Sequence, residues 1–125
     1  MKSARPCQVL VVEDEAIVRD YLQCCLEDCG YLVWSAASAN EAIVRCNEAD
    51  HIDLLLTDVH IAGSSGVDLA NRLLGQFKNL QVLFISGDAS LPPHALAKTQ
   101  LLKKPFTPDA LTNAVQSVLA GETAK

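Results

Sequence analysis

The sequence predicts an α/β domain in which a five-stranded parallel sheet is covered by helices on both faces. Short apolar runs rich in valine, leucine and isoleucine alternate with amphipathic stretches along the whole chain. The runs are nearly continuous rather than alternating, as expected for strands buried on both faces. With 125 residues, half of them apolar, the chain is long enough for one sizeable core. Strands that alternate with helices are joined by right-handed crossovers into a doubly wound sheet.

The first half of the chain contains two strand-helix units. Residues 8–12 form a β-branched run that stops at Glu13-Asp14-Glu15. A helical pattern runs from Ala16 until Gly30 ends it, and residues 31–35 read as the second strand. A second helix over residues 41–46 can be capped by Ser38 or by Asn40.

The second half repeats this alternation with one irregular segment. Residues 52–57 form a strand that leads to Asp58, and a glycine-containing loop precedes a helix over residues 67–74. Residues 81–85 form the fourth strand, residues 101–103 the fifth, and a last helix starts at 107–109 and ends before Gly121. Between the last two strands, Pro92-Pro93 leaves few residues for a helix, so we expect this fourth helix to be short or absent.

Composition and charge narrow the function classes. A formal net charge of -5 weighs against nucleic-acid binding, which usually needs a basic face. No apolar run approaches the roughly 18 to 20 residues that span a bilayer, and the first residues lack the apolar core of a secretory signal. We therefore expect one cytoplasmic domain over residues 1–125, with its core at about residues 7–120, and no membrane association.

The cysteine pattern does not favour a disulfide scaffold or a zinc site. The count of five is odd, and no two cysteines are separated by two residues. Because free cysteine behaves as a small apolar residue, the sequence predicts that these side chains pack in the core.

Reactive side chains fall at the predicted carboxyl ends of strands, where open α/β sheets bind ligands. Glu13 and Asp14 follow the first strand, Asp58 the third, Ser86 the fourth and Lys104 the fifth. Three carboxylates in one cleft repel each other unless a cation neutralises them. Oxygen ligands with room for water suit magnesium better than zinc, so we expect a magnesium site.

Four motifs in this order resemble the response-regulator receiver domain of two-component signalling. The resemblance spans the whole chain and implies the flavodoxin-like strand order 2-1-3-4-5. The motifs are Val11-Val12-Glu13-Asp14-Glu15, Leu56-Thr57-Asp58 with Gly66 eight residues on, Ile85-Ser86-Gly87, and Lys104-Pro105-Phe106.

The resemblance implies a role for each strand-end residue. Asp58 would accept a phosphoryl group from a phosphohistidine of a histidine kinase or histidine phosphotransfer protein, and the domain would later hydrolyse the aspartyl phosphate itself, without being an enzyme in any other sense. Lys104 and Ser86 would contact the phosphoryl group, and Lys104-Pro105 would be a cis peptide. Magnesium would be bound by Asp14, Asp58 and the backbone carbonyl of His60, with Glu13 acting through water.

The chain departs from the family pattern on one surface. Leu101 replaces an aromatic residue that usually signals phosphorylation, and the segment from Ser86 to Lys104 is shorter than usual by roughly one helical turn. Ala62 stands where a proline is common, and Asp88, like His60, is expected at the mouth of the pocket. These differences predict that the chemistry of Asp58 is kept, whereas the surface that usually passes the signal to a partner is altered.

Three functions are compatible with these residues. The first is a phosphorylation-controlled binding module, which could also pair with a second copy of itself, and the second is a phosphate relay or sink. The third is a haloacid-dehalogenase-type aspartyl-phosphate phosphatase, which ranks low because its DxD signature is missing after the first strand. The sequence names neither the kinase nor the oligomeric state, and fits both a separate regulator and a receiver within a hybrid kinase.

Overall fold

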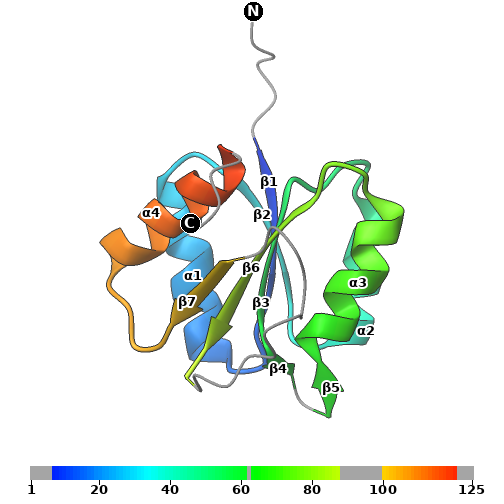
Figure 1. The fold of residues 1–125 in the computed structure, drawn as a ribbon, viewed down its shortest axis with the longest axis horizontal. Helices are drawn as coiled ribbons and strands as arrows, with labels where there is room; N and C mark the ends of the chain where they lie inside the picture. Colours follow the sequence, from blue (N-terminus) through cyan, green and yellow to red (C-terminus); the bar gives the residue numbers. More distant parts are fainter. Residues whose placement is uncertain (1–6, 62, 88–99, 121–125) are drawn as a thin grey trace, which may run out of the picture.

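The computed structural model describes residues 7–61, 63–87 and 100–120, which form a parallel sheet between two layers of helices (Figure 1). Within these residues the main sheet has five strands in the order β2-β1-β3-β6-β7. This order confirms the expected 2-1-3-4-5 arrangement, because β6 and β7 are the fourth and fifth predicted strands. The strands are β1 (Gln8–Val12), β2 (Leu32–Ala36), β3 (Leu54–Asp58), β6 (Gln81–Ser86) and β7 (Gln100–Lys103).

Two helices cover each face of the sheet. On one side lie α1 and α4, and on the other lie α2 and α3 (Figure 1). The predicted short or absent fourth helix, Ala62 and Asp88 lie outside the described residues. The helices are α1 (Ala16–Asp28), α2 (Ala39–Glu48), α3 (Gly66–Gln76) and α4 (Pro108–Leu119).

The core has two halves because successive residues of a strand point to opposite faces of the sheet. In β3, Leu54 and Leu56 pack toward α1 and α4, whereas Leu55 packs toward α2 and α3. The same alternation holds in β6, where Phe84 faces the second pair of helices. All four side chains are fully buried. A strand that is apolar at every position therefore requires cover on both faces.

Local hydrogen bonds explain where the helices begin. Ser38 accepts from the N–H of Glu41, which resolves the choice between Ser38 and Asn40 in favour of the serine. Ser65 caps α3 by accepting from the N–H groups of Val67 and Asp68. A short hairpin of β4 (His60–Ile61) and β5 (Ser64–Ser65), which the sequence analysis treated as a loop, precedes this cap. At its tip Gly63 has a φ of 69°, a conformation that favours glycine.

The prediction that the cysteines pack in the core is wrong for three of them. Cys46 is buried, and burial raises the pKa of its thiol to about 11. Three cysteines are exposed: Cys7 directly precedes β1, Cys24 lies on the solvent-facing side of α1, and Cys29 is the C-cap residue of that helix. All five are free thiols.

A membrane-spanning helix would need a long apolar stretch, and none of the helices within residues 7–61, 63–87 and 100–120 provides one.

Candidate functional site

The expected strand-end residues lie together at the carboxyl edge of the sheet, which is the lower edge in Figure 1. Asp58 is the last residue of β3, at the centre of the sheet. Lys104 directly follows β7, and its backbone N–H donates to the Ser86 carbonyl at the end of β6 over 2.9 Å. The Lys104-Pro105 peptide is cis, as predicted.

An ion pair between Asp58 and Lys104 forms the centre of the site. The Lys104 ammonium donates to Asp58 Oδ2 over 2.8 Å, although the two residues are 46 positions apart. The other carboxylate oxygen, Oδ1, lies 3.3 Å from the N–H of His60. Burial lowers the pKa of Lys104, but the hydrogen bond and charge of Asp58, with smaller effects of Glu13 and Glu15, outweigh burial and raise it. Lys104 therefore stays charged beside the carboxylate.

Glu13 is the second acidic group of the site and is almost completely buried, with 1% of its surface exposed. Oε2 accepts from the N–H of Glu15 over 3.1 Å, whereas Oε1 has no hydrogen-bond partner among the residues that the structure describes and lies 3.7 Å from Lys104 Nζ. Burial raises the pKa of the Glu13 carboxyl, and the nearby charge of Asp58 adds to this effect. Its contacts with Glu15 and Lys104 oppose the shift only in part. The cost of burying the charged Glu13 carboxylate is thus only partly offset by its contacts with Glu15 and Lys104.

The other expected residues lie around this pair. Asp14 is exposed in the turn between β1 and α1, close enough to Glu13 that its side chain also raises the Glu13 pKa. His60 has an exposed side chain in β4, and its backbone lies beside the Asp58 carboxylate. Ser86 is buried at the end of β6, one residue beyond Ile85, which pairs with Asp58.

The backbone at Asp58 is held from two sides. The Thr57 hydroxyl, fully buried, donates to the Asp58 carbonyl over 2.9 Å. Gly66, the first residue of α3, donates its N–H to the Val59 carbonyl over 2.7 Å. A Cβ added at Gly66 would lie 2.0 Å from the Asp58 carbonyl oxygen, so only glycine allows this close approach.

The available oxygen ligands fit magnesium, which keeps several waters, better than they fit a metal that needs a complete shell of side-chain ligands. In the part of the chain that the structure describes, no three acidic, histidine or cysteine side chains are grouped closely enough to hold a metal. Magnesium usually takes one or two carboxylates and keeps several waters, so a full cage is not required. The buried Oε1 of Glu13 receives no hydrogen bond within residues 7–61, 63–87 and 100–120, and this favours a cation or its bound water at this place.

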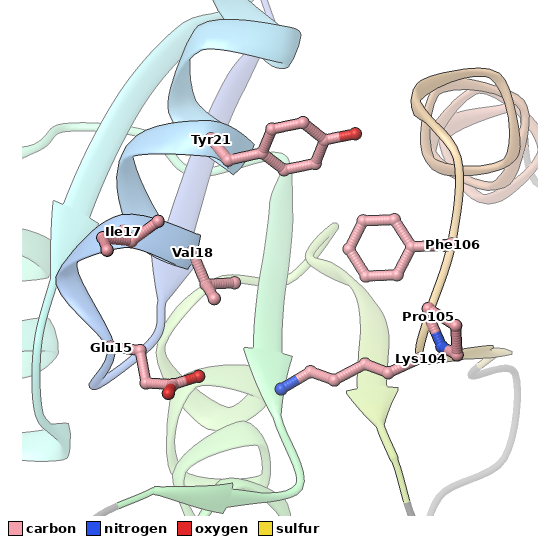
Figure 2. Close-up of a pocket in the computed structure, with 7 residues that line it drawn as sticks. All are labelled: Glu15, Ile17, Val18, Tyr21, Lys104, Pro105 and Phe106. Carbon is pink, nitrogen blue, oxygen red and sulfur yellow. The ribbon is translucent and has the colours of Figure 1, made fainter.

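An apolar groove adjoins the acidic site on the α1 side. It encloses about 370 Å³, and Figure 2 shows Lys104 extending across its base toward α1. The Tyr21 and Phe106 rings form one end, with centroids 6.3 Å apart. Ile17 lies on the rim with 85% of its surface exposed. The groove is lined by Glu15, Ile17, Val18, Tyr21, Lys104, Pro105 and Phe106.

Sequence reasoning missed one residue of this region. Arg19 donates from Nη1 to the backbone carbonyl of Glu13 over 2.8 Å. A signal was available, since a basic residue in the first turn of a helix is unfavourable to the helix dipole and suggests a compensating contact.

Comparison with known proteins identifies the class of domain. A family model for the response regulator receiver domain matches residues 9–116, and the chain belongs to this family. It is a receiver domain of the two-component response regulator type, and receiver domains are signalling domains that are usually not classical enzymes. Domains of this family interact with histidine kinases or phosphotransfer proteins, and the family in general binds magnesium.

Individual relatives agree with this assignment. The chain is 32% identical over 116 residues to the response regulator receiver protein CpdR of Brucella abortus, which covers 90% of this chain and 96% of CpdR. Among solved structures, a response regulator receiver protein from Sinorhizobium medicae superimposes with a TM-score of 0.84 at 29% identity, over 94% of this chain and 98% of that one. The chemotaxis response regulator CheY4 of Vibrio cholerae gives 0.79 at 28% identity, over 91% and 99%.

Other relatives are much longer than this chain. The two-component response regulator PhoP of Pseudomonas aeruginosa is 38% identical over 79 residues, which cover 63% of this chain but 35% of PhoP. The sensor kinase/phosphatase CqsS of Vibrio cholerae is 31% identical over 122 residues, which cover 91% of this chain but only 18% of CqsS.

Proposed function

We propose that Asp58 accepts a phosphoryl group from the phosphohistidine of a histidine kinase or phosphotransfer protein. The observation that supports this most directly is the Asp58 carboxylate at the end of a buried strand, 2.8 Å from the Lys104 ammonium and next to the buried Glu13. Acidic groups seldom end a run as apolar as Leu54–Leu56 without a functional reason. Membership of the receiver-domain family also leads us to expect that Asp58 is the phosphoacceptor.

The transfer needs positioning and charge neutralisation more than covalent catalysis. A carboxylate oxygen of Asp58 attacks phosphorus, a P–O bond forms, and the P–N bond breaks with its electron pair going to the imidazole nitrogen. Lys104 then pairs with the phosphoryl oxygens, and the Ser86 hydroxyl donates to one of them. Hydrolysis later restores the Asp58 carboxylate and releases inorganic phosphate.

Magnesium, when bound, would neutralise the charge on the phosphoryl oxygens. We propose that Asp14, Asp58 and the His60 carbonyl hold it directly and that Glu13 acts through water. The partly uncompensated burial of Glu13 favours this assignment, since a cation nearby would stabilise its charged form.

The groove beside α1 is the proposed contact surface for the phosphodonor protein. Lys104 lines both the groove and the acidic site, so the groove lies next to the place that the partner's phosphohistidine must reach. An isoleucine with 85% exposure on its rim would be buried by such a partner. Pairing with a second copy through α1 or α4 is a further proposal, tested by light scattering with and without the phosphodonor.

The phosphoacceptor assignment is tested by labelling with a small phosphodonor such as acetyl phosphate. With magnesium the parent should gain one phosphoryl group in intact-protein mass spectrometry, and Asp58→Asn should gain none. Asp20→Asn, which changes an exposed aspartate on α1, is the matched control and should label like the parent. Labelling of Asp58→Asn at the parent's rate would refute the assignment.

The consequence of phosphorylation is either a switch or a relay or sink. Leu101 packs against the core cluster that contains Phe84, and it has no polar tip that could move between two hydrogen-bonded positions. This favours the relay or sink. Amide chemical shifts with beryllofluoride and magnesium separate the two proposals, because a switch requires changes beyond the pocket, at residues 88–103.

The remaining proposals concern the domain and its setting. We propose one receiver domain, with its core at about residues 7–120, that acts in the cytoplasm. The phosphatase alternative has little support, because Glu13-Asp14 stands where the DxD signature of that class would begin.

A further inference from the structure

Arg19 occupies an unusual position in the first turn of α1. A positive charge near the amino end of a helix opposes the helix dipole. The cap residue Glu15 makes no side-chain hydrogen bond to the helix, and the first turn contains no acidic residue. The Arg19 side chain is nevertheless partly buried, because its guanidinium folds back onto the preceding turn.

The contact that holds Arg19 is specific. Nη1 donates to the Glu13 carbonyl over 2.8 Å, and the Arg19 N–H donates to the Glu15 carbonyl over 2.9 Å. Arg19 is thus anchored through both its backbone and its side chain to the turn that connects β1 with α1.

The same turn presents the acidic pair. The Glu13 N–H donates to the Ala36 carbonyl over 3.0 Å, and Glu13 Oε2 accepts from the N–H of Glu15, so the bond from Arg19 is a third hydrogen bond on Glu13. The Glu13 carbonyl belongs to the peptide plane that joins Glu13 to Asp14. A donor that holds this carbonyl therefore restricts the orientation of the peptide plane to which the Asp14 Cα is bonded, and with it the directions open to the Asp14 side chain.

We propose that Arg19 is a positioning residue of the magnesium site and orients Glu13 and Asp14 through the Glu13 carbonyl. This inference rests on the proposed function, because the two carboxylates are the proposed ligands. Arg19 itself contacts neither metal nor phosphate. Partners of this kind typically change metal affinity by about 10- to 100-fold when they are lost.

The sign of the effect distinguishes positioning from charge. Arg19→Met removes a positive charge close to a cation site, so Coulomb repulsion alone predicts tighter magnesium binding. Loss of positioning predicts weaker binding. We expect the magnesium Kd of Arg19→Met to rise by at least about tenfold, and that of Arg19→Lys, which keeps a donor, to rise less.

Arg45→Met is the matched control. Arg45 Nε also donates to a backbone carbonyl, that of Ser35, over 3.2 Å, but Arg45 lies on α2, on the other face of the sheet from α1, and its acceptor is in β2 rather than in the turn that holds the acidic pair. Magnesium binding is measured by isothermal titration calorimetry on the full chain, and urea unfolding in EDTA reports stability without metal. Both methionine variants should lose some stability, and only Arg19→Met should lose magnesium affinity.

The outcomes separate failure of the proposed metal site from failure of the positioning role alone. A parent that binds no magnesium would refute the metal part of the proposed function and this inference with it. If the parent binds magnesium and Arg19→Met binds it equally or more tightly, the inference alone is wrong. If Arg19→Met does not fold, Arg19→Lys and Arg19→Gln provide the comparison, and unchanged Kd values in both would overturn the positioning role.

Discussion

Gly66 allows a sharp test of how the backbone positions the phosphoacceptor. A Cβ at this residue would lie 2.0 Å from the Asp58 carbonyl oxygen and 3.1 Å from that of Val59. Ordinary contact begins at 3.4 Å, so the first distance is 1.4 Å too short. Both obstacles are backbone atoms rather than the end of a flexible side chain. Gly66→Ala must therefore displace either the start of α3 or the Asp58 peptide.

The size of this effect can be estimated from the displacement. Overpacking of this kind typically costs about 1–3 kcal/mol of stability. A shift of about 1 Å at a reacting group can reduce its rate by about 100-fold. We therefore expect Gly66→Ala to lower the urea midpoint and to slow phosphorylation of Asp58 by acetyl phosphate by about 100-fold, measured by intact-protein mass spectrometry over time.

Gly75→Ala is the control within the same helix. Nothing lies within 4 Å of a Cβ at Gly75, and alanine is the better helix former by roughly 0.5–1 kcal/mol. This variant should be as stable as the parent or more so and should label at the parent's rate. If Gly66→Ala is as stable as the parent and labels as fast, the close packing of Gly66 against the Asp58 carbonyl is not needed for phosphorylation.

Two further predictions concern Glu13 and the groove. Burial raises the pKa of Glu13 in the folded state, so its stabilising contribution is full below pH 4.5 and is lost as the pH rises through the raised value. Glu13→Gln has no carboxyl to ionise and so does not lose this stability. In EDTA, the unfolding free energy of Glu13→Gln minus that of the parent should therefore increase between pH 4 and pH 7. A difference that does not change with pH would contradict a raised pKa for Glu13. Ile17→Ser should slow phosphoryl transfer from a cognate kinase by about tenfold, the effect of losing about 1.4 kcal/mol of contact, while labelling by acetyl phosphate stays unchanged. Val44→Ser, which replaces a half-exposed residue on α2, is its control, and equal slowing of both variants would argue against the groove as the contact surface.

The strand positions follow from local properties of the chain, which explains why they could be predicted. A run such as Leu54–Leu56 is stable only with cover on both faces, and a polar residue at its end must lie at the sheet edge. Asp58, Ser86 and Lys104 could thus be placed without coordinates. Core packing was predicted wrongly for Cys24 because helical spacing does not tell which face of α1 meets the core, and the hairpin around Gly63 was missed because its strands contain two residues each.

The sequence alone determined the fold class, the strand order through the family resemblance, and the residues that meet at the carboxyl edge. Only the tertiary structure decided how they meet. Three features depend on side-chain direction across neighbouring elements: the 2.8 Å contact of Lys104 with Asp58, the Oε1 of Glu13 with no hydrogen-bond donor among the described residues, and the hydrogen bond from Arg19 to the Glu13 carbonyl. Periodicity assigns a residue to a strand end or a helix face, but distances within such a cluster are set by packing of the whole sheet against its helices.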